Sequence, residues 1–393
     1  MADNLTGVAI LGSTGSVGTQ ALDVLAGLRH RFRVVGLAAG RNVELFDQQV
    51  RQWRPSLISC SEPADRSRIQ SDAAEWASLE EIVTHPDVDV VLIATTGKAG
   101  LGPTLSALGS GKAVALANKE VLVMAGELIR AAVDAGSGSL RPVDSEHSAI
   151  WQCLWGELPE YVSRLILTAS GGAFRDRTVE ELAGVTPSEA LHHPTWSMGR
   201  KITVDSATLL NKGMEMIEAR WLFDIPLDRI DVLMHRESIV HSLVQFADGS
   251  VKAQLGVPDM RLPIQCSLTY PERLPVQRSQ ALDLGAIGTL HFAEPNFDRL
   301  PCLRLAIDAG KRGGTYPAVM AAADETAVEQ FLGGRIGFMD IPRVIEATLN
   351  AHNGTASPDL PAILDADRWA RDYALATSAS SQWSGAALPA TAS

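Results

Sequence analysis

The sequence contains few cysteines and lacks any long apolar run. Its 393 residues include 4 cysteines, at Cys60, Cys153, Cys266 and Cys302, with neither a CxxC pair nor the histidine spacing of a zinc site. They predict reduced, buried thiols rather than a disulfide framework. No stretch approaches the ~20 apolar residues of a membrane helix, and no basic segment precedes the apolar run Val8–Leu11, so we expect no signal peptide. These absences predict a cytoplasmic protein with no membrane partner.

Positive charge is also scarce. The formal net charge is −12 and hydrophobic residues make up 46% of the chain, which indicates a globular protein with a solvated acidic surface rather than a disordered one. We therefore expect no nucleic-acid partner. Any cation that binds a substrate must be a particular Lys or Arg acting against an unfavourable background field.

Short β-branched runs alternate with helical patterns in the first part of the chain. Strands are expected at Val8–Leu11, Val34–Ala38, Leu57–Cys60, Val88–Thr95, Ala113–Leu116 and Leu140–Val143, and helices at about Ser16–Leu28, Val43–Gln52 and Lys119–Ala135. This βαβ rhythm predicts an α/β fold with a Rossmann-like parallel sheet. Because a chain of this length should hold two or three domains, we place a nucleotide-binding domain at residues 1–144.

After residue 144 the pattern changes to mixed helix and strand. Strands are expected at Arg164–Thr168, Ile230–His235, Ile239–Phe246 and Val251–Leu255, with a hairpin turn at Asp248-Gly249. They predict a central α+β catalytic domain with an open sheet over 145–275, a lid loop at 192–201 within it, and a linker at 276–302. Helical spacing at Leu303–Ala309, Ala318–Leu332, Ile341–Leu349 and Leu364–Ala374 predicts a C-terminal α-helical bundle over 303–376. Residues 377–393, rich in Ser, Ala and Thr, are expected to be disordered.

A glycine-rich loop, Gly12-Ser-Thr-Gly15-Ser-Val-Gly18, follows the first expected strand and opens the first expected helix. In that context glycine lets the backbone approach a pyrophosphate, and the helix N-terminus offers N–H groups and partial positive charge. Thr14 and Ser16 can add hydroxyl donors. The loop predicts dinucleotide binding, with a merely tight strand–helix turn as the alternative.

The residues after the second expected strand bear on the choice of dinucleotide. NAD enzymes commonly place a carboxylate there for the ribose 2′-hydroxyl, whereas this chain has Gly40-Arg41-Asn42. A guanidinium attracts a 2′-phosphate, so NADP is favoured over NAD. The alternative is that Arg41 is an ordinary surface charge.

Two carboxylates, Asp144 and Glu146, stand where a strand is expected to end, and residues two apart on a strand project to the same side. Held together they repel each other unless a hard divalent cation such as Mg²⁺ or Mn²⁺ compensates through oxygen ligands. Glu215 is a third candidate ligand, and on a helix it shares a face with Asn211 and Lys212, a pair suited to a phosphate. Solvated loop acids are the alternative for Asp144 and Glu146.

Two further segments have the composition of binding loops. Ser170-Gly171-Gly172 follows an expected strand and predicts either a backbone nest for an anion or a turn. The loop His193–Gly199 has a rigid His-Pro start and a glycine end, with Trp196 and Met198 between them. These properties fit a lid that closes over a substrate and excludes water; the alternative is that both side chains belong to the core.

Taken together, these segments resemble the 1-deoxy-D-xylulose 5-phosphate reductoisomerase family over nearly the whole chain. The most specific stretches are Gly12–Gly18, Ala117–Glu120, Pro142–His147, Thr168–Arg175, His193–Glu215 and Gly256–Arg261. Two segments depart from the family pattern. Ala173 stands where proline is usual, and Met320–Glu325 lacks two asparagines, having Ala321 and Asp324 among its residues.

The resemblance implies a role for each group of site residues. Cofactor contacts would come from Thr14, Gly15, Ser16, Val17, Gly40, Arg41, Asn42, Asn118, Glu120 and Gly199. The implied metal ligands are Asp144, Glu146 and Glu215, and Lys119 and Lys212 complete the catalytic set. Substrate contacts would come from Lys119, Ser145, Glu146, Ser170, His193, Trp196, Ser206, Asn211, Lys212 and Glu215. His241 and Met260 also match positions close to that pocket.

The resemblance also implies a reaction. The family rearranges 1-deoxy-D-xylulose 5-phosphate and reduces the resulting aldehyde with hydride from NADPH, giving 2-C-methyl-D-erythritol 4-phosphate, with Mn²⁺ or Mg²⁺ bound and a homodimer as the assembly. Two alternatives stay open. An NADP-dependent semialdehyde or homoserine-type dehydrogenase would need no divalent ion for hydride transfer, and a non-enzymatic NADPH-sensing module would leave the acids and the lid without a use.

Overall fold

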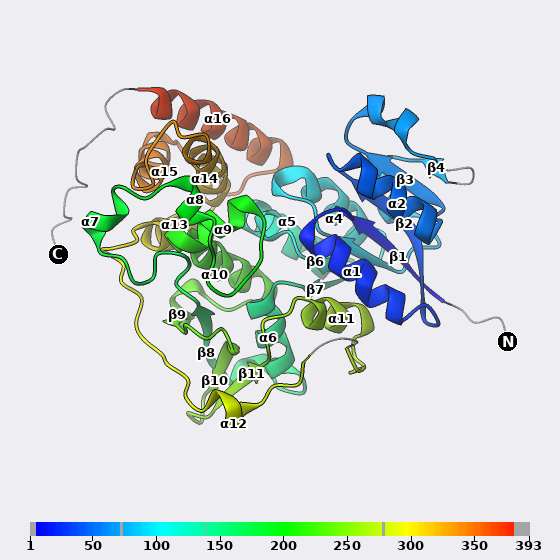
Figure 1. The fold of residues 1–393 in the computed structure, drawn as a ribbon, viewed down its shortest axis with the longest axis horizontal. Coiled ribbons are helices and arrows are strands. Elements are labelled where there is room, and N and C mark those ends of the chain that lie inside the picture. The colour runs from blue at the N-terminus through cyan, green and yellow to red at the C-terminus, as the bar shows by residue number, and fades with distance from the viewer. Residues whose placement is uncertain (1–4, 71–73, 137, 277–279, 381–393) are drawn as a thin grey trace. The chain divides into compact units, whose positions relative to one another are not determined.

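The structure, a computed structural model, describes residues 5–70, 74–136, 138–276 and 280–380 (Figure 1). The chain divides into two compact units. The first takes its described residues from 1–122, 126–160 and 252–283, and the second from 123–125, 161–251 and 284–393. No helix among the described residues is both long enough and apolar enough to cross a bilayer.

The first unit is built on a seven-stranded sheet with the order β4-β3-β2-β1-β5-β6-β7. Its strands are β1 Thr6–Leu11, β2 Phe32–Ala39, β3 Leu57–Cys60, β4 Glu75–Trp76, β5 Val90–Ile93, β6 Ala113–Leu116 and β7 Ser139–Pro142. Neighbouring strands pair in parallel. Their Val, Ile and Leu side chains are buried on both faces, as in a doubly wound sheet. The predicted Rossmann-like domain is confirmed.

Helices connect and cover these strands. They are α1 Ser16–Gly27, α2 Val43–Trp53, α3 Leu79–Thr84, α4 Leu101–Gly109, α5 Lys119–Ala135, α6 Ser145–Leu154 and α11 Arg261–Thr269. One core cluster joins α1, α2 and α11 to the strands, with Leu25, Phe46 and Ile264 buried against Val8 and Leu92. This packing supports the strand ends, where the expected nucleotide loop begins.

The α6 helix corrects one prediction. We expected Asp144 and Glu146 to project together from a strand end, but β7 ends at Pro142 and the two carboxylates belong to a helix start. Asp144 is the N-cap residue, and its Oδ1 accepts a hydrogen bond from the Ser145 N–H at 2.9 Å. Glu146 lies in the first turn, where a negative charge suits the partial positive charge of a helix N-terminus.

A second sheet has the order β11-β10-β8-β9. Its strands are β8 Val162–Ala169, β9 Ile230–Met234, β10 Val240–Phe246 and β11 Val251–Leu255. It is mixed, because β8 pairs antiparallel with β10 and parallel with β9. The predicted hairpin turn is present at Asp248-Gly249, where the Phe246 N–H donates to the Ser250 carbonyl at 2.9 Å and Gly249 has φ +85°.

Apart from β8, β9 and β10, the second unit is mainly helical. Its helices are α7 Val179–Leu182, α8 Pro187–Ala190, α9 Arg200–Thr208, α10 Leu210–Phe223, α12 Leu284–Ile287, α13 Cys302–Arg312, α14 Tyr316–Leu332, α15 Asp340–Ala351 and α16 Leu360–Ala379. Helices α13 to α16 form the predicted C-terminal helical region, with α14 buried over most of its length. The expected disordered tail, 377–393, begins inside α16, and from residue 381 it lies outside the described residues. Within the expected linker, 277–279 also lie outside them.

Candidate functional site

The glycine-rich loop joins β1 to α1 in the geometry expected of a phosphate loop. Gly12 has φ +91°, and a Cβ on it would lie 2.3 Å from the Ala94 carbonyl oxygen; a Cβ on Gly18 would lie 2.3 Å from the Gly12 carbonyl oxygen. Only glycine fits these two positions. Gly15 is the N-cap of α1 and has no side chain to accept from the first-turn N–H groups. The helix start, with Thr14, Ser16 and Val17 around it, is therefore arranged to receive an anion.

The segment Gly40-Arg41-Asn42 lies between β2 and α2, as expected. Arg41 is exposed, so its guanidinium is accessible to a ligand. Asn42 has a structural role that the sequence did not reveal, because its Oδ1 caps α2 by accepting from the Leu45 N–H at 3.2 Å. Glu44, the nearest following acid, forms an ion pair with Arg68. No carboxylate therefore stands at the end of β2 itself.

Asn118 is the N-cap of α5 and is buried. Its Nδ2 donates to the Gly97 carbonyl at 2.9 Å and to Thr95 Oγ1 at 3.2 Å. Its Oδ1 is buried without a hydrogen-bond partner in the described part of the chain. Because leaving a buried acceptor unsatisfied costs free energy, this atom fits the N–H of a bound ligand. Glu120 lies half-buried in the following turn.

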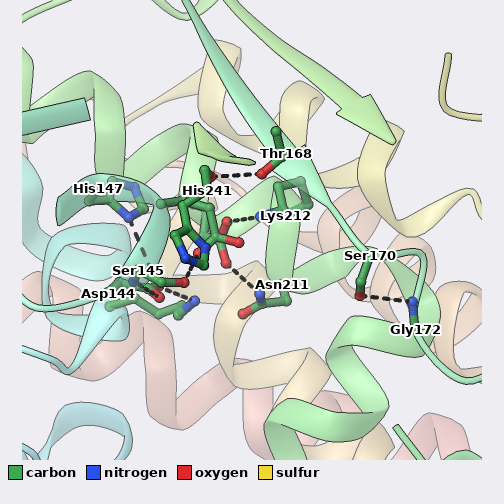
Figure 2. A network of polar contacts seen from close by, with 12 residues as sticks. Asp144, Ser145, His147, Thr168, Ser170, Gly172, Asn211, Lys212 and His241 are labelled. Atoms are coloured by element: carbon green, nitrogen blue, oxygen red, sulfur yellow. Dashed lines mark hydrogen bonds and ion pairs between the residues drawn. The ribbon is translucent and has the colours of Figure 1, made fainter. Parts of the chain in front are cut away.

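A charged group surrounds the start of α6 in the first unit (Figure 2). The side chain of Lys119 is 5% exposed and its Nζ lies 2.5 Å from Asp144 Oδ2. The Ser145 hydroxyl donates to Glu146 Oε2 at 2.5 Å. Four of the predicted site residues are thus brought together, as two carboxylates, one ammonium group and one hydroxyl.

His147 is a neighbour of this group that the sequence reasoning did not single out. It is fully buried in α6, and its Nδ1 lies 3.9 Å from Asp144 Oδ2. The spacing of three residues from the helix-capping Asp144 was the available signal, since such residues share one helix face. A histidine here can fix the orientation of the carboxylate.

A second charged group lies at the start of α10 in the second unit. Lys212 forms an ion pair with Glu215, and the Asn211 Nδ2 donates to the same carboxylate. The helix face predicted for these three residues is therefore confirmed. Glu215 is 1% exposed and Lys212 is 4% exposed. A buried carboxylate needs a compensating cation, which Lys212 supplies in this structure.

The loop after β8 forms a compact turn against α9. Gly171 and Gly172 have φ +86° and +67°, so successive N–H groups can line a concave nest. A Cβ on Gly172 would lie 2.6 Å from the Ser206 carbonyl oxygen, which shows how closely the loop approaches the helix. The loop that carries Ser170 and Gly172 (Figure 2) therefore lies against the part of α9 that carries the half-buried Ser206.

The loop between α8 and α9, which was expected to act as a lid, is irregular from His192 to Gly199. His193 Nε2 lies 3.0 Å from Ser170 Oγ, which ties the start of this loop to the nest. Burial, together with the charge of Arg175, lowers the pKa of His193 to about 4. Trp196 is half-buried, and its ring centroid lies 6.2 Å from that of His241 on β10. Gly199 is the N-cap of α9.

His241 itself is buried, and its backbone carbonyl accepts from Thr168 Oγ1 at 2.7 Å (Figure 2). Met260, in the first unit, is half-buried against the core cluster that covers the nucleotide sheet. Both residues pack among neighbouring elements, and the ring of His241 in addition lies near that of Trp196.

Known protein families match this chain along most of its length. Residues 8–126 match the model described as 1-deoxy-D-xylulose 5-phosphate reductoisomerase, and residues 140–223 match the model of the C-terminal domain of that enzyme. Residues 255–373 match a third model, described as DXP reductoisomerase C-terminal domain. The three matches follow one another in chain order.

Individual relatives agree with the family models. The chain is 52% identical over 376 residues to a 1-deoxy-D-xylulose 5-phosphate reductoisomerase from Geobacillus kaustophilus, covering 93% of this chain and 98% of the relative. A solved structure of the enzyme from Zymomonas mobilis in complex with NADPH has a TM-score of 0.89 and 40% identity, covering 96% of this chain and 100% of that one. A structure of DOX-P reductoisomerase with NADPH, fosmidomycin and magnesium also has a TM-score of 0.89, with 37% identity over 95% of this chain and 98% of its own.

Proposed function

This chain belongs to the 1-deoxy-D-xylulose 5-phosphate reductoisomerase family, and we infer that it converts 1-deoxy-D-xylulose 5-phosphate to 2-C-methyl-D-erythritol 4-phosphate with NADPH and a divalent cation. It is an NADP-dependent oxidoreductase and isomerase. The observation that carries this conclusion is the combination, in one chain, of a glycine-rich loop at a Rossmann-like sheet with two carboxylates, one half-buried and one buried, that lysines neutralise. A plain dehydrogenase or a sensor would have no use for the second feature.

Most of the residues proposed to bind the cofactor belong to the first unit. We assign the pyrophosphate to the start of α1 at Gly15, Ser16 and Val17, with Thr14 beside it, and the 2′-phosphate to Arg41 with Gly40 and Asn42. The buried acceptor Asn118 Oδ1 fits the carboxamide N–H of a nicotinamide. Glu120 and Gly199 complete the proposed contacts. Bound NADPH supplies the hydride that reduces the rearranged aldehyde.

The donor set at the two charged groups fits a hard divalent cation. Asp144, Glu146 and Glu215 offer carboxylate oxygens, which Mg²⁺ and Mn²⁺ prefer. In this structure Lys119 neutralises Asp144, and Lys212 neutralises Glu215. A divalent cation held there would polarise the substrate's carbonyl and hydroxyl oxygens.

The chain's own residues then divide the remaining work. Lys119, with Ser145, and Lys212 donate hydrogen bonds to the substrate oxygens on which charge develops during rearrangement. Ser170, Ser206, Asn211 and Lys212 bind the phosphate, which is a remote handle whose binding energy can order the lid. His193 supports this anion site, and Trp196 covers the carbon chain and excludes water.

An assay of NADPH oxidation with 1-deoxy-D-xylulose 5-phosphate, with and without Mn²⁺, tests the proposal. We expect consumption only when both the sugar phosphate and the cation are present. NADPH consumption that persists when EDTA removes the divalent cation would favour a semialdehyde or homoserine-type dehydrogenase. NADPH binding without turnover under any of these conditions would favour a sensing module.

We also propose that the protein is a homodimer and works in the cytoplasm. Strand β11 lies at an edge of its sheet, and Val251 at its start is 49% exposed. An exposed strand edge with apolar side chains favours pairing with a second copy. The four cysteines are free thiols, which suits a reducing compartment. Light scattering tests the dimer, and a Val251→Lys variant should shift the mass towards that of one chain.

A further inference from the structure

His193, at the start of the lid loop, forms hydrogen bonds through both ring nitrogens. Its Nδ1 lies 3.1 Å from the Thr195 backbone nitrogen and 2.9 Å from the Trp196 backbone nitrogen, and it accepts a hydrogen bond from each. A ring nitrogen that accepts cannot carry a proton. The neutral ring therefore has its proton on Nε2, which faces Ser170 Oγ at 3.0 Å and donates to it.

The Ser170 hydroxyl receives a second donor, the Gly172 N–H, at 3.3 Å. A hydroxyl group has one hydrogen to donate and two lone pairs that accept. Because both lone pairs face protein donors, the hydroxyl hydrogen is what Ser170 can offer to a ligand. The site therefore favours a ligand atom that only accepts, such as an oxygen of a phosphate dianion, over a sugar hydroxyl.

The charge state of the ring agrees with this arrangement. Burial, together with the charge of Arg175, lowers the pKa of His193 to about 4, so the ring is neutral at neutral pH. A protonated ring would carry a hydrogen on Nδ1 and would repel the Thr195 and Trp196 N–H groups. One neutral tautomer of His193 thus links the position of the lid backbone to the direction in which the Ser170 hydroxyl donates its hydrogen bond.

We propose that His193 is a positioning residue that couples order in the lid to recognition of the phosphate at Ser170. The proposal rests on the proposed function, in which Ser170 contacts the phosphate. With the lid backbone in place, His193 can only donate towards Ser170, and Ser170 can only donate towards the ligand. When Thr195 and Trp196 move away, Nδ1 loses both hydrogen-bond donors. Neither the position of the ring proton nor the orientation of the Ser170 hydroxyl is then fixed. Since such coupling is reciprocal, a bound phosphate stabilises the ordered lid that carries Trp196.

Two substitutions at His193 separate its contact with the lid backbone from its contact with Ser170. An asparagine has its acceptor oxygen near the position of Nδ1, so His193→Asn keeps an acceptor for the lid N–H groups, as in an Asx turn, and loses the contact with Ser170. A glutamine reaches further, so His193→Gln keeps a donor to Ser170 and loses the lid contacts. Ser170→Ala and the double variant Ser170→Ala/His193→Asn complete a cycle, and His30→Asn, at an exposed histidine of the first unit, is the control.

The first readout is KM for the sugar phosphate, with KM for NADPH measured beside it. We expect Ser170→Ala and His193→Asn each to raise KM for the sugar phosphate about tenfold, the scale of one charge-assisted hydrogen bond. The double variant should be no worse than either single variant, because both remove the same oriented donor. KM for NADPH should stay unchanged in all of them, as should both values in the control.

The second readout does not depend on turnover. Amide hydrogen exchange of residues 193–199 should slow in the wild-type protein when inorganic phosphate is added. In His193→Asn the lid should be protected without phosphate but should not respond to it, and in His193→Gln the protection should be lost. The coupling would be overturned if the effects of the two single substitutions on KM multiply in the double variant. It would also be overturned if added phosphate still slows amide exchange of the lid in His193→Asn. An unchanged KM in Ser170→Ala would overturn the phosphate assignment itself, and the coupling with it.

Discussion

Lys201 in the first turn of α9 reaches across to the buried Asp324 of α14, with its Nζ 2.7 Å from Asp324 Oδ2. The same Nζ lies 2.7 Å from Asp205 Oδ2. Asp324 is 0% exposed and Asp205 is 1% exposed, so two carboxylates share one ammonium group in the interior. Asp324 belongs to the segment Met320–Glu325, where this chain lacks the two asparagines expected from the family pattern.

Asp324 makes stability depend on pH. Burial raises the pKa of Asp324, and the attraction of Lys201 opposes this. A carboxyl group whose folded pKa lies above its unfolded value contributes stability that is fully present below the unfolded pKa and is lost as pH rises through the folded pKa. As pH rises from about 4 to about 8, we expect the melting temperature of Asp324→Asn to fall by less than that of the wild type. Scanning fluorimetry measures both curves. The matched control is Asp365→Asn, since Asp365 is 69% exposed beside Arg368; parallel curves for wild type and Asp324→Asn would contradict the prediction.

Glu215→Gln should separate turnover from cofactor binding. The substitution keeps the shape of the side chain and its contact with Asn211, but it removes the charge proposed to bind the cation. We expect kcat to fall by more than about 100-fold, the upper range for disrupting a metal site, while the affinity for NADPH in a fluorescence titration stays the same. Equal losses of both would count against the division of labour between the two units.

Arg41→Asp should narrow the preference for NADPH over NADH. The variant replaces a cation that attracts the 2′-phosphate by an anion that repels it, so the ratio of the two kcat/KM values should fall by about tenfold or more. Arg33→Asp is the matched control, because Arg33 is an arginine of β2 paired with Asp87. An unchanged ratio in Arg41→Asp would exclude this residue from 2′-phosphate recognition.

His193 should titrate with a midpoint of about 4. Since its folded pKa lies below the unfolded value of about 6.5, the unfolded chain binds more protons between these values. The contribution of His193 to stability is therefore present above pH 6.5 and is lost as pH falls towards 4. NMR of the ring protons, assigned with His193→Asn, gives the midpoint. A value near 6.5 would show that Nδ1 does not accept from the lid.

Much of the fold could be predicted from local patterns. The strands Leu57–Cys60, Ala113–Leu116 and Val251–Leu255 and the helix Lys119–Ala135 have the predicted bounds, because buried apolar periodicity is a property of consecutive residues. The start of α6 was missed because the three residues from Asp144 were assigned to a strand end. An aspartate followed by a serine and a glutamate is also an N-cap signal, and that interpretation agrees with the structure.

The sequence by itself determined many of the elements, the glycine-rich loop and the shared helix face of Asn211, Lys212 and Glu215, since each depends on spacing along one stretch of chain. Only the tertiary structure decided which partner each charged or polar group has. The ion pair of Lys201 with Asp324, the unsatisfied oxygen of Asn118 and the proton position on His193 depend on atoms brought together from separate segments. Burial then makes each partner energetically decisive, because an interior group cannot exchange its partner for water.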